Sequence, residues 1–223
     1  MAAGWSWGAL LIAFFVTSSA LSRFRRELKE QRTGGIVAKG GERDAVQVLA
    51  NGAPFALAAV ASLALPWSGW AALAGGALAT AAADTWATEV GTLADGPPRS
   101  ILSGEAVPPG TSGGVTAAGT LAALGGACFV AALARLFDWP PAVAVGAAVG
   151  GFAGATADSL LGATVQARRW CDRCDAATER LTHGCGTPTR RVGGVPWLDN
   201  DAVNAASALA GASIALVVAR ALA

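Results

Sequence analysis

Charged residues are scarce in this chain. Only 16 Lys or Arg residues and 15 Asp or Glu residues occur among 223, so that 14% of the residues are charged, whereas ordinary soluble domains contain about 25%. Hydrophobic residues make up 53% of the chain, and its mean hydropathy is +0.48. This composition excludes an ordinary soluble domain and predicts a polytopic membrane protein.

Two further features that the chain lacks narrow its class. No stripe of basic residues indicates a nucleic-acid partner. No positively charged region precedes the first apolar stretch, and its basic residues follow it, so we interpret this stretch as a mature membrane span rather than a signal peptide. Glycine is abundant instead, with 29 residues, and small residues let helices pack closely in lipid.

Long apolar runs predict an all-α fold, a polytopic bundle of about six transmembrane helices, because roughly 20 helical residues cross the hydrocarbon core. The predicted spans are 4–22, 45–65, 70–91, 112–137, 142–167 and 199–222. We expect residues 1–223 to form a single membrane domain. Its polar loops 1, 3 and 5 are predicted near residues 23–44, 92–111 and 168–198.

The basic residues are concentrated in these three loops. Loops 1, 3 and 5 contain seven, one and six Lys or Arg residues, which is 14 of the 16 in the chain. By the positive-inside rule the three loops face the cytoplasm and both termini lie outside. We therefore expect a protein of a bacterial plasma membrane whose active site faces the cytoplasm.

The stretch 77–91 places two acids inside an apolar run. An ionisable side chain within a span costs at least about 2.5 to 3.5 kcal/mol, so it usually faces a bundle interior or a wet cavity and marks a functional site. Asp84 and Thr88 share one helical face, and Thr85 and Glu89 share the adjacent face. The alternative is a polar pair that only holds helices together.

Span 142–167 carries a second polar stripe. Asp158, Gly162 and Gln166 recur every four residues, and Ser159 lies beside them, so an acid and an amide share one face. Asp158 and Ser159 also follow Asp84 and Thr85 at an offset of 74 residues. This echo predicts a possible internal repeat of two helix hairpins, and chance similarity is the alternative.

Two further helices begin with amides and acids at helical spacing. The polar residues are Gln47 and Asn51 in span 45–65, and Asp199, Asn200, Asp201 and Asn204 in span 199–222. Acids in a first helical turn can also serve only as caps or dipole partners, and Asp199 has this alternative. Together the four helices offer oxygen ligands at one level, which suits magnesium.

A glycine-rich turn opens span 112–137. Its residues are Gly110, Thr111, Ser112, Gly113 and Gly114. Such a turn running into a helix N-terminus presents backbone N–H groups to an anion such as a phosphate, although it lacks the spaced glycine and the lysine of a Walker A motif. Arg99, and also Lys39 and Arg43, could clamp phosphate oxygens. The alternatives are an ordinary turn and basic residues that only set the topology.

Loop 5 contains three cysteines and the only histidine of the chain, as Cys171, Cys174, His183 and Cys185. Thiols on the cytoplasmic side stay reduced, which argues against a disulfide. A CxxC pair followed by histidine and cysteine supplies four ligands for a structural zinc, and a metal-free loop is the alternative.

Six segments, taken together, resemble the signature blocks of one membrane family. They are 40–51, 83–91, 98–99, 109–114, 157–162 and 197–204. The family includes plant phytyl-phosphate kinase and transmembrane protein 19. Many of its members have more apolar sequence before the first block, so we expect an initial helix to be missing or shortened here.

The resemblance implies a CTP-dependent kinase that converts an isoprenoid monophosphate, phytyl or prenyl, to the diphosphate. The expected catalytic residues are Asp84, Glu89, Arg99 and Asp158, and the expected magnesium ligands are Asp84, Asp158, Asp199 and Asp201. The expected substrate and nucleotide contacts are Asn51, Thr85, Gly110, Thr111, Ser112, Gly113, Gly114, Ser159, Gln166, Asn200 and Asn204. The alternatives are an ion-coupled transporter or channel that uses the intramembrane acids, and a lipid cytidylyltransferase.

Overall fold

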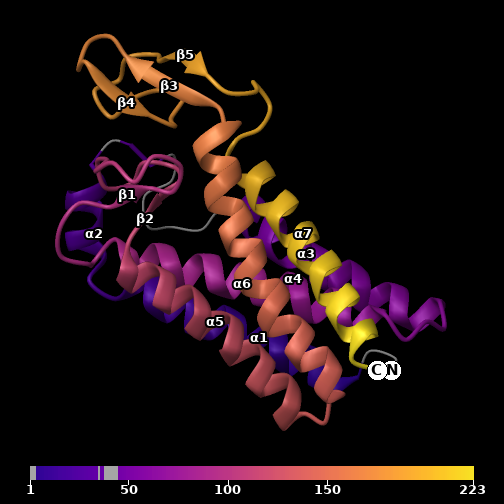
Figure 1. Cartoon of the computed structure of the whole chain (residues 1–223). Coiled ribbons are helices and arrows are strands. Elements are labelled where there is room, and N and C mark those ends of the chain that lie inside the picture. Colours follow the sequence, from indigo (N-terminus) through magenta and orange to yellow (C-terminus); the bar gives the residue numbers. More distant parts are fainter. Residues whose placement is uncertain (1–3, 35, 38–44) are drawn as a thin grey trace.

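The computed structural model describes residues 4–34, 36–37 and 45–223, with the side chains of 45–49 left out. This part of the chain contains six helices of 19 to 24 residues, one in each predicted span (Figure 1). They are α1 (Trp5–Arg23), α3 (Ala45–Ala64), α4 (Trp70–Gly91), α5 (Ala117–Leu136), α6 (Pro141–Thr164) and α7 (Asn200–Ala221). The predicted helix bundle is therefore confirmed.

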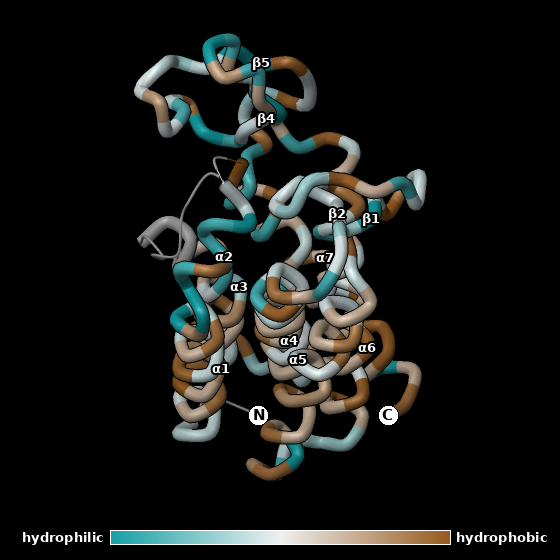
Figure 2. The backbone as a smooth tube through the Cα atoms, turned by 90° about the vertical axis from the view of Figure 1, so that its left-hand side faces the viewer, coloured by the Kyte–Doolittle hydropathy of each residue, from teal (hydrophilic) through white to brown (hydrophobic). Residues whose placement is uncertain are grey.

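The outer faces of these helices are apolar. Leu57, Leu121 and Val217 are 69%, 70% and 68% exposed, and Figure 2 shows hydrophobic colouring along the bundle. Exposed apolar surface of this extent on helices indicates contact with lipid. By length and composition, α1, α5, α6 and α7 can each cross a membrane.

Helix α4 is the centre of the bundle and contacts α1, α3, α5, α6 and α7. Its residues Ala74, Ala77 and Leu78 are fully buried. Small residues also let α6 and α7 approach closely, because a Cβ atom on Gly150 would lie only 2.3 Å from the carbonyl oxygen of Gly211. Close backbone approach of this kind lets dispersion contacts stabilise helices in lipid. Asp84 and Glu89 follow this buried stretch toward the end of α4, and both are only partly buried.

The polar loops gather at the end of the bundle opposite to the start of α1 and the end of α7 (Figure 1). Loop 1 contains the short helix α2 (Arg26–Thr33). Strands β1 (Arg99–Ser100) and β2 (Gly114–Val115) pair antiparallel in loop 3. Loop 5 forms a three-stranded sheet of order β4-β3-β5, from β3 (Arg168–Cys171), β4 (Ala176–Thr178) and β5 (Arg190–Gly193). The prediction of an all-α fold missed these two small sheets.

Two predicted helix starts are also corrected. Helix α5 begins at Ala117 rather than 112, because Gly114 and Val115 pair with β1 and the Thr116 side chain accepts a hydrogen bond from the N–H of Gly119 at 2.9 Å. Helix α7 begins at Asn200, and Asp199 Oδ1 accepts from the N–H of Ala202 at 3.0 Å. Asp199 is thus the N-cap of α7, as its structural alternative predicted.

Candidate functional site

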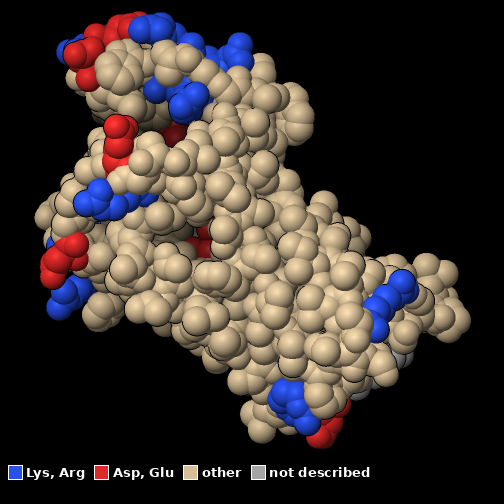
Figure 3. Space-filling view, in the orientation of Figure 1, with Lys and Arg blue, Asp and Glu red and all other residues tan. Residues whose placement is uncertain are grey.

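A cavity of about 820 Å³ lies where the helices meet the loop end. Its walls come from α2, α4, α5, α6, the glycine turn of loop 3 and the end of β4 in loop 5. Figure 3 shows acidic side chains inside hollows of this region. Residues from separate parts of the chain therefore meet around one cavity.

Among the five carboxylates that line this cavity are Asp84 of α4, Asp158 of α6 and Glu179 just after β4. Asp158 lies close enough to the other two for their charges to interact, and its Oδ2 accepts a hydrogen bond from Ser207 Oγ at 2.9 Å. Hard cations such as magnesium take oxygen ligands. Of the four expected magnesium ligands, Asp84 and Asp158 line the cavity, whereas Asp199 and Asp201 are not among its lining residues.

Sequence reasoning missed Glu179, which no motif marks. Its Oε1 accepts a hydrogen bond from Gln166 Nε2 at 2.8 Å and another from Ser112 Oγ. Both donors are predicted site residues, and Gln166 is 3% exposed. The signal that could have found Glu179 is its place between two halves of the predicted metal motif, since Cys174 precedes it and His183 follows it.

The glycine turn lines the cavity with residues 110–114. Gly113 has a φ of +76°, and a Cβ atom there would lie 2.4 Å from that of Ala163 in α6, so only glycine allows this contact. The prediction that this turn runs directly into a helix N-terminus is wrong, because the turn leads into β2 and α5 begins only at Ala117. In addition, the N–H groups of Thr111 and Gly114 donate within the turn, at 3.1 and 2.9 Å.

Three basic residues of α2, namely Arg26, Lys29 and Arg32, form another wall. Lys29 is buried, pairs with Glu89 of α4, and donates to the carbonyl oxygens of Leu21 and Ser22 at 2.7 and 2.9 Å. Ser22 Oγ also donates to Glu89 at 2.6 Å. Glu89 therefore joins α4 to the end of α1 and to α2, and this contact gives it a structural role.

Some predicted site residues are not among those that line the cavity. They are Asn51, Thr85, Arg99, Asp199, Asp201 and Asn204, whereas Ser159 and Asn200 do line it. Arg99 is exposed and donates through Nη1 to the carbonyl oxygen of Gly104 at 2.8 Å. Asn51, Thr85 and Asn204 are buried. Lys39, Arg43 and the side chain of Gln47 lie outside the described residues.

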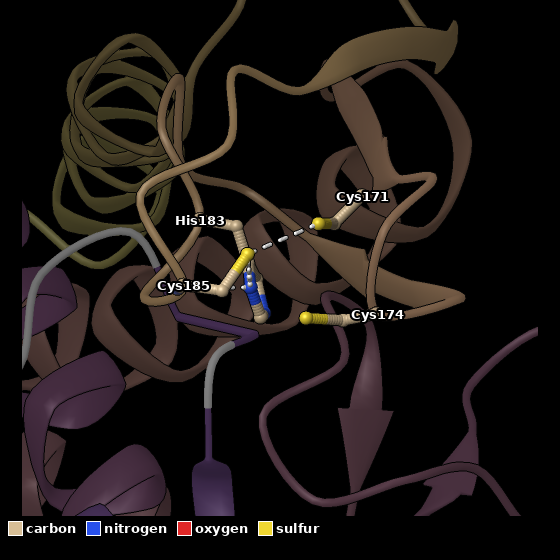
Figure 4. Close-up of side chains that lie close together, drawn as sticks. All are labelled: Cys171, Cys174, His183 and Cys185. Carbon is tan, nitrogen blue, oxygen red and sulfur yellow. Dashed lines mark hydrogen bonds between the residues drawn. The ribbon is translucent and has the colours of Figure 1, made fainter.

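The predicted cysteine and histidine ligands come together in loop 5 (Figure 4). The ligand atoms of Cys171, Cys174, His183 and Cys185 all lie within 4.8 Å of one another. Hydrogen bonding with Thr187, and then with His183, lowers the pKa of the Cys185 thiol to about 5. The four residues form a Cys3His cluster that could hold a metal ion such as zinc.

The fold and the site define an integral membrane helix bundle with an acidic cavity at one end and a Cys3His cluster beside it. A family model described as integral membrane protein DUF92 matches residues 1–212, and the chain belongs to this family.

Several relatives have similar sequences. Protein PGR of Arabidopsis thaliana is 33% identical over 93% of this chain and 79% of its own length. An uncharacterized membrane protein of Methanocaldococcus jannaschii is 34% identical over 72% of this chain and 65% of its own. An uncharacterized membrane protein of Synechocystis is 30% identical over 96% of this chain and 74% of its own length. No solved structure matches the chain.

Proposed function

We propose that the protein is a CTP-dependent kinase that phosphorylates an isoprenoid monophosphate to the diphosphate. The observation that carries this proposal is the cavity, which Asp84 and Asp158 line together with basic residues of α2 and the glycine turn. Carboxylates that can hold a cation, together with groups that can bind phosphate, suit phosphoryl transfer. The resemblance to the phytyl-phosphate kinase family supports the same reaction.

In this proposal an oxygen of the lipid monophosphate attacks the γ-phosphorus of CTP, and the bond between that phosphorus and the β-bridging oxygen breaks to release CDP. Asp84 and Asp158 would hold magnesium, which neutralises phosphate charge when bound. Arg26 and Arg32 attract the phosphates to the cavity, and Thr111 orients them. The acceptor is already an anion, so positioning and charge neutralisation matter more than a strong base.

The lipid tail requires an apolar wall within the membrane-embedded part of the cavity. Ala123 of α5 and Phe152 and Ala155 of α6 supply such a wall next to the carboxylates. We assign the phosphate end of the lipid to the polar half of the cavity and the isoprenoid chain to this wall.

Transfer of label from CTP distinguishes this reaction from its alternatives. Purified protein is incubated with magnesium, phytyl or geranylgeranyl monophosphate, and CTP labelled at either the α- or the γ-phosphate. The kinase should move only the γ label into lipid and release CDP. Entry of the α label would instead indicate a cytidylyltransferase, and transfer of neither label would contradict the kinase and favour a transporter or channel.

We further propose that the Cys3His cluster binds zinc in a structural role, since four protein ligands leave no open position for a substrate. Protein purified without added metal should contain about one zinc per chain by elemental analysis. Cys171→Ser should lose it, whereas the control Cys128→Ser, on the exposed side of α5, should retain it. Metal-free wild-type protein with an unchanged fold would rule out this site.

We also propose that the loop end faces the cytoplasm of a bacterial cell, because 14 of the 16 basic residues belong to loops 1, 3 and 5. A membrane-impermeant maleimide should label Asp138→Cys, in the turn between α5 and α6, in intact cells. Ser103→Cys in loop 3 should react only after permeabilisation. The reverse pattern would invert the orientation and place the cavity outside.

A further inference from the structure

Glu179 connects two walls of the cavity. One carboxylate oxygen accepts hydrogen bonds from Ser112 of the glycine turn and from Gln166, which follows the end of α6. Ser112, Gln166 and Glu179 all line the cavity. Hydrogen bonds to a charged acceptor are roughly twice as strong as neutral ones. A single side chain of loop 5 therefore fixes the turn of loop 3 against α6.

The backbone around Glu179 is itself held from two sides. Its N–H donates to the carbonyl oxygen of Ile36 at 2.7 Å, and Arg180 Nε donates to that of Val37 at 2.8 Å, so loop 1 holds the segment on one side. On the other side β4 pairs with β3, which ends at Cys171.

The Cys3His cluster encloses this segment in the sequence. Cys174 lies before β4, and His183 lies four residues after Glu179. Since the four ligand atoms of the cluster lie within 4.8 Å of one another, a bound metal would tie both ends of the segment together. The four ligands of the cluster are not among the residues that line the cavity, whereas Glu179 is.

We propose that Glu179 is a positioning residue of the cavity, and that the metal-bound Cys3His cluster holds it in place. The cluster thereby controls the order of the glycine turn from a distance. Loss of the metal releases the Glu179 segment, the hydrogen bonds to Ser112 and Gln166 break, and the turn loosens. The consequence for catalysis rests on the proposed kinase function, and the effect of metal loss rests on the proposed zinc site, whereas the effect of Glu179 on the turn rests on neither.

Hydrogen exchange of the turn amides tests this coupling without any transfer reaction. Thr111 and Gly114 donate within the turn, so exchange in 109–114 reports how often the turn opens. Glu179→Ala should accelerate it roughly tenfold to a hundredfold, as expected for losing bonds to a charged acceptor. Glu179→Gln keeps an acceptor oxygen without the charge, so it should accelerate exchange less than Glu179→Ala does.

Removal of the metal should reproduce the effect of Glu179→Ala. In wild-type protein a zinc-selective chelator, with magnesium kept in excess, should accelerate exchange in 109–114 to the rate of Glu179→Ala. In that variant the chelator should add nothing, because the two changes break one connection. The control Asp172→Ala removes an exposed acid in the turn after β3, paired with Arg190, and should behave as wild type.

Two results would overturn the proposal. One is unchanged exchange in 109–114 for both Glu179→Ala and chelated wild-type protein. The other is an additive effect of the variant and the chelator, which would show independent actions. A catalytic readout adds a third check, since Glu179→Ala should raise the KM for CTP more than it lowers kcat. If the protein transfers no label at all while the exchange effects hold, the kinase fails and the coupling stands.

Discussion

Replacing Asp84 or Asp158 by asparagine should lower the rate of γ-label transfer by roughly a hundredfold to a thousandfold, the scale at which a preorganised electrostatic group acts in catalysis. Asparagine preserves the size of the side chain and can still form hydrogen bonds, such as the one that Asp158 receives from Ser207. It removes the negative charge that a divalent cation requires. The variants should therefore fold and bind lipid but not transfer phosphate.

The opposite result is expected if these acids only hold helices together. An uncharged amide would then serve equally well and would avoid the cost of a buried charge. Asp138→Asn is a suitable control, because Asp138 lies in the turn before α6, away from the cavity, with a φ of +59° that asparagine tolerates. Thermal unfolding and gel filtration verify the fold of each variant. Equal transfer rates in all variants would refute the cation site.

Removal of the Lys29 charge should have the largest effect on stability. Lys29 is 7% exposed and pairs with Glu89, which joins α2 to α4. Lys29→Met leaves the Glu89 carboxylate without this partner in a partly buried site, and such a break costs about 3 kcal/mol of unfolding free energy. The double variant Lys29→Met, Glu89→Leu should recover most of the loss, because neither charge then remains unpaired.

This pair also decides the role of Glu89. If Glu89 is structural, as its contacts indicate, the double variant should regain activity together with stability. If Glu89 is catalytic, stability should return while transfer stays absent. Asp172→Asn is a matched control, since its pair with Arg190 has side chains 65% and 59% exposed and should contribute at most about 1 kcal/mol. Equal unfolding midpoints of Lys29→Met and wild type would contradict the structural role.

Much of the fold could be predicted from apolar runs of membrane length. Every predicted span contains a helix, because hydrophobic length is a strong signal in lipid. The short strands could not be predicted in this way, since β1 and β2 contain two residues each. Their pairing depends on the turn at Gly113 and its contact with α6, which only the tertiary structure shows.

Part of the candidate site could be predicted from the helical spacing of polar residues. Helical spacing gives the depth of a side chain and the face it shares. Asp84 and Asp158, which spacing predicts at one level, line one cavity. Spacing does not tell whether that helical face lines a cavity or packs against another helix. Asn51 and Asn204, for example, are buried and are not among the residues that line the cavity. Glu179 comes from a loop, where no periodicity exists to mark it.

We expect the cavity to bind both the cation and the phosphates of CTP. Anomalous scattering from crystals grown with manganese and a non-hydrolysable CTP analogue tests it most directly, because manganese takes the oxygen ligands of magnesium and can be located by its own signal. We expect a manganese peak bonded to the carboxylates of Asp84 and Asp158, with the triphosphate beside residues 110–114. A nucleotide bound with its manganese elsewhere on the protein would contradict the account.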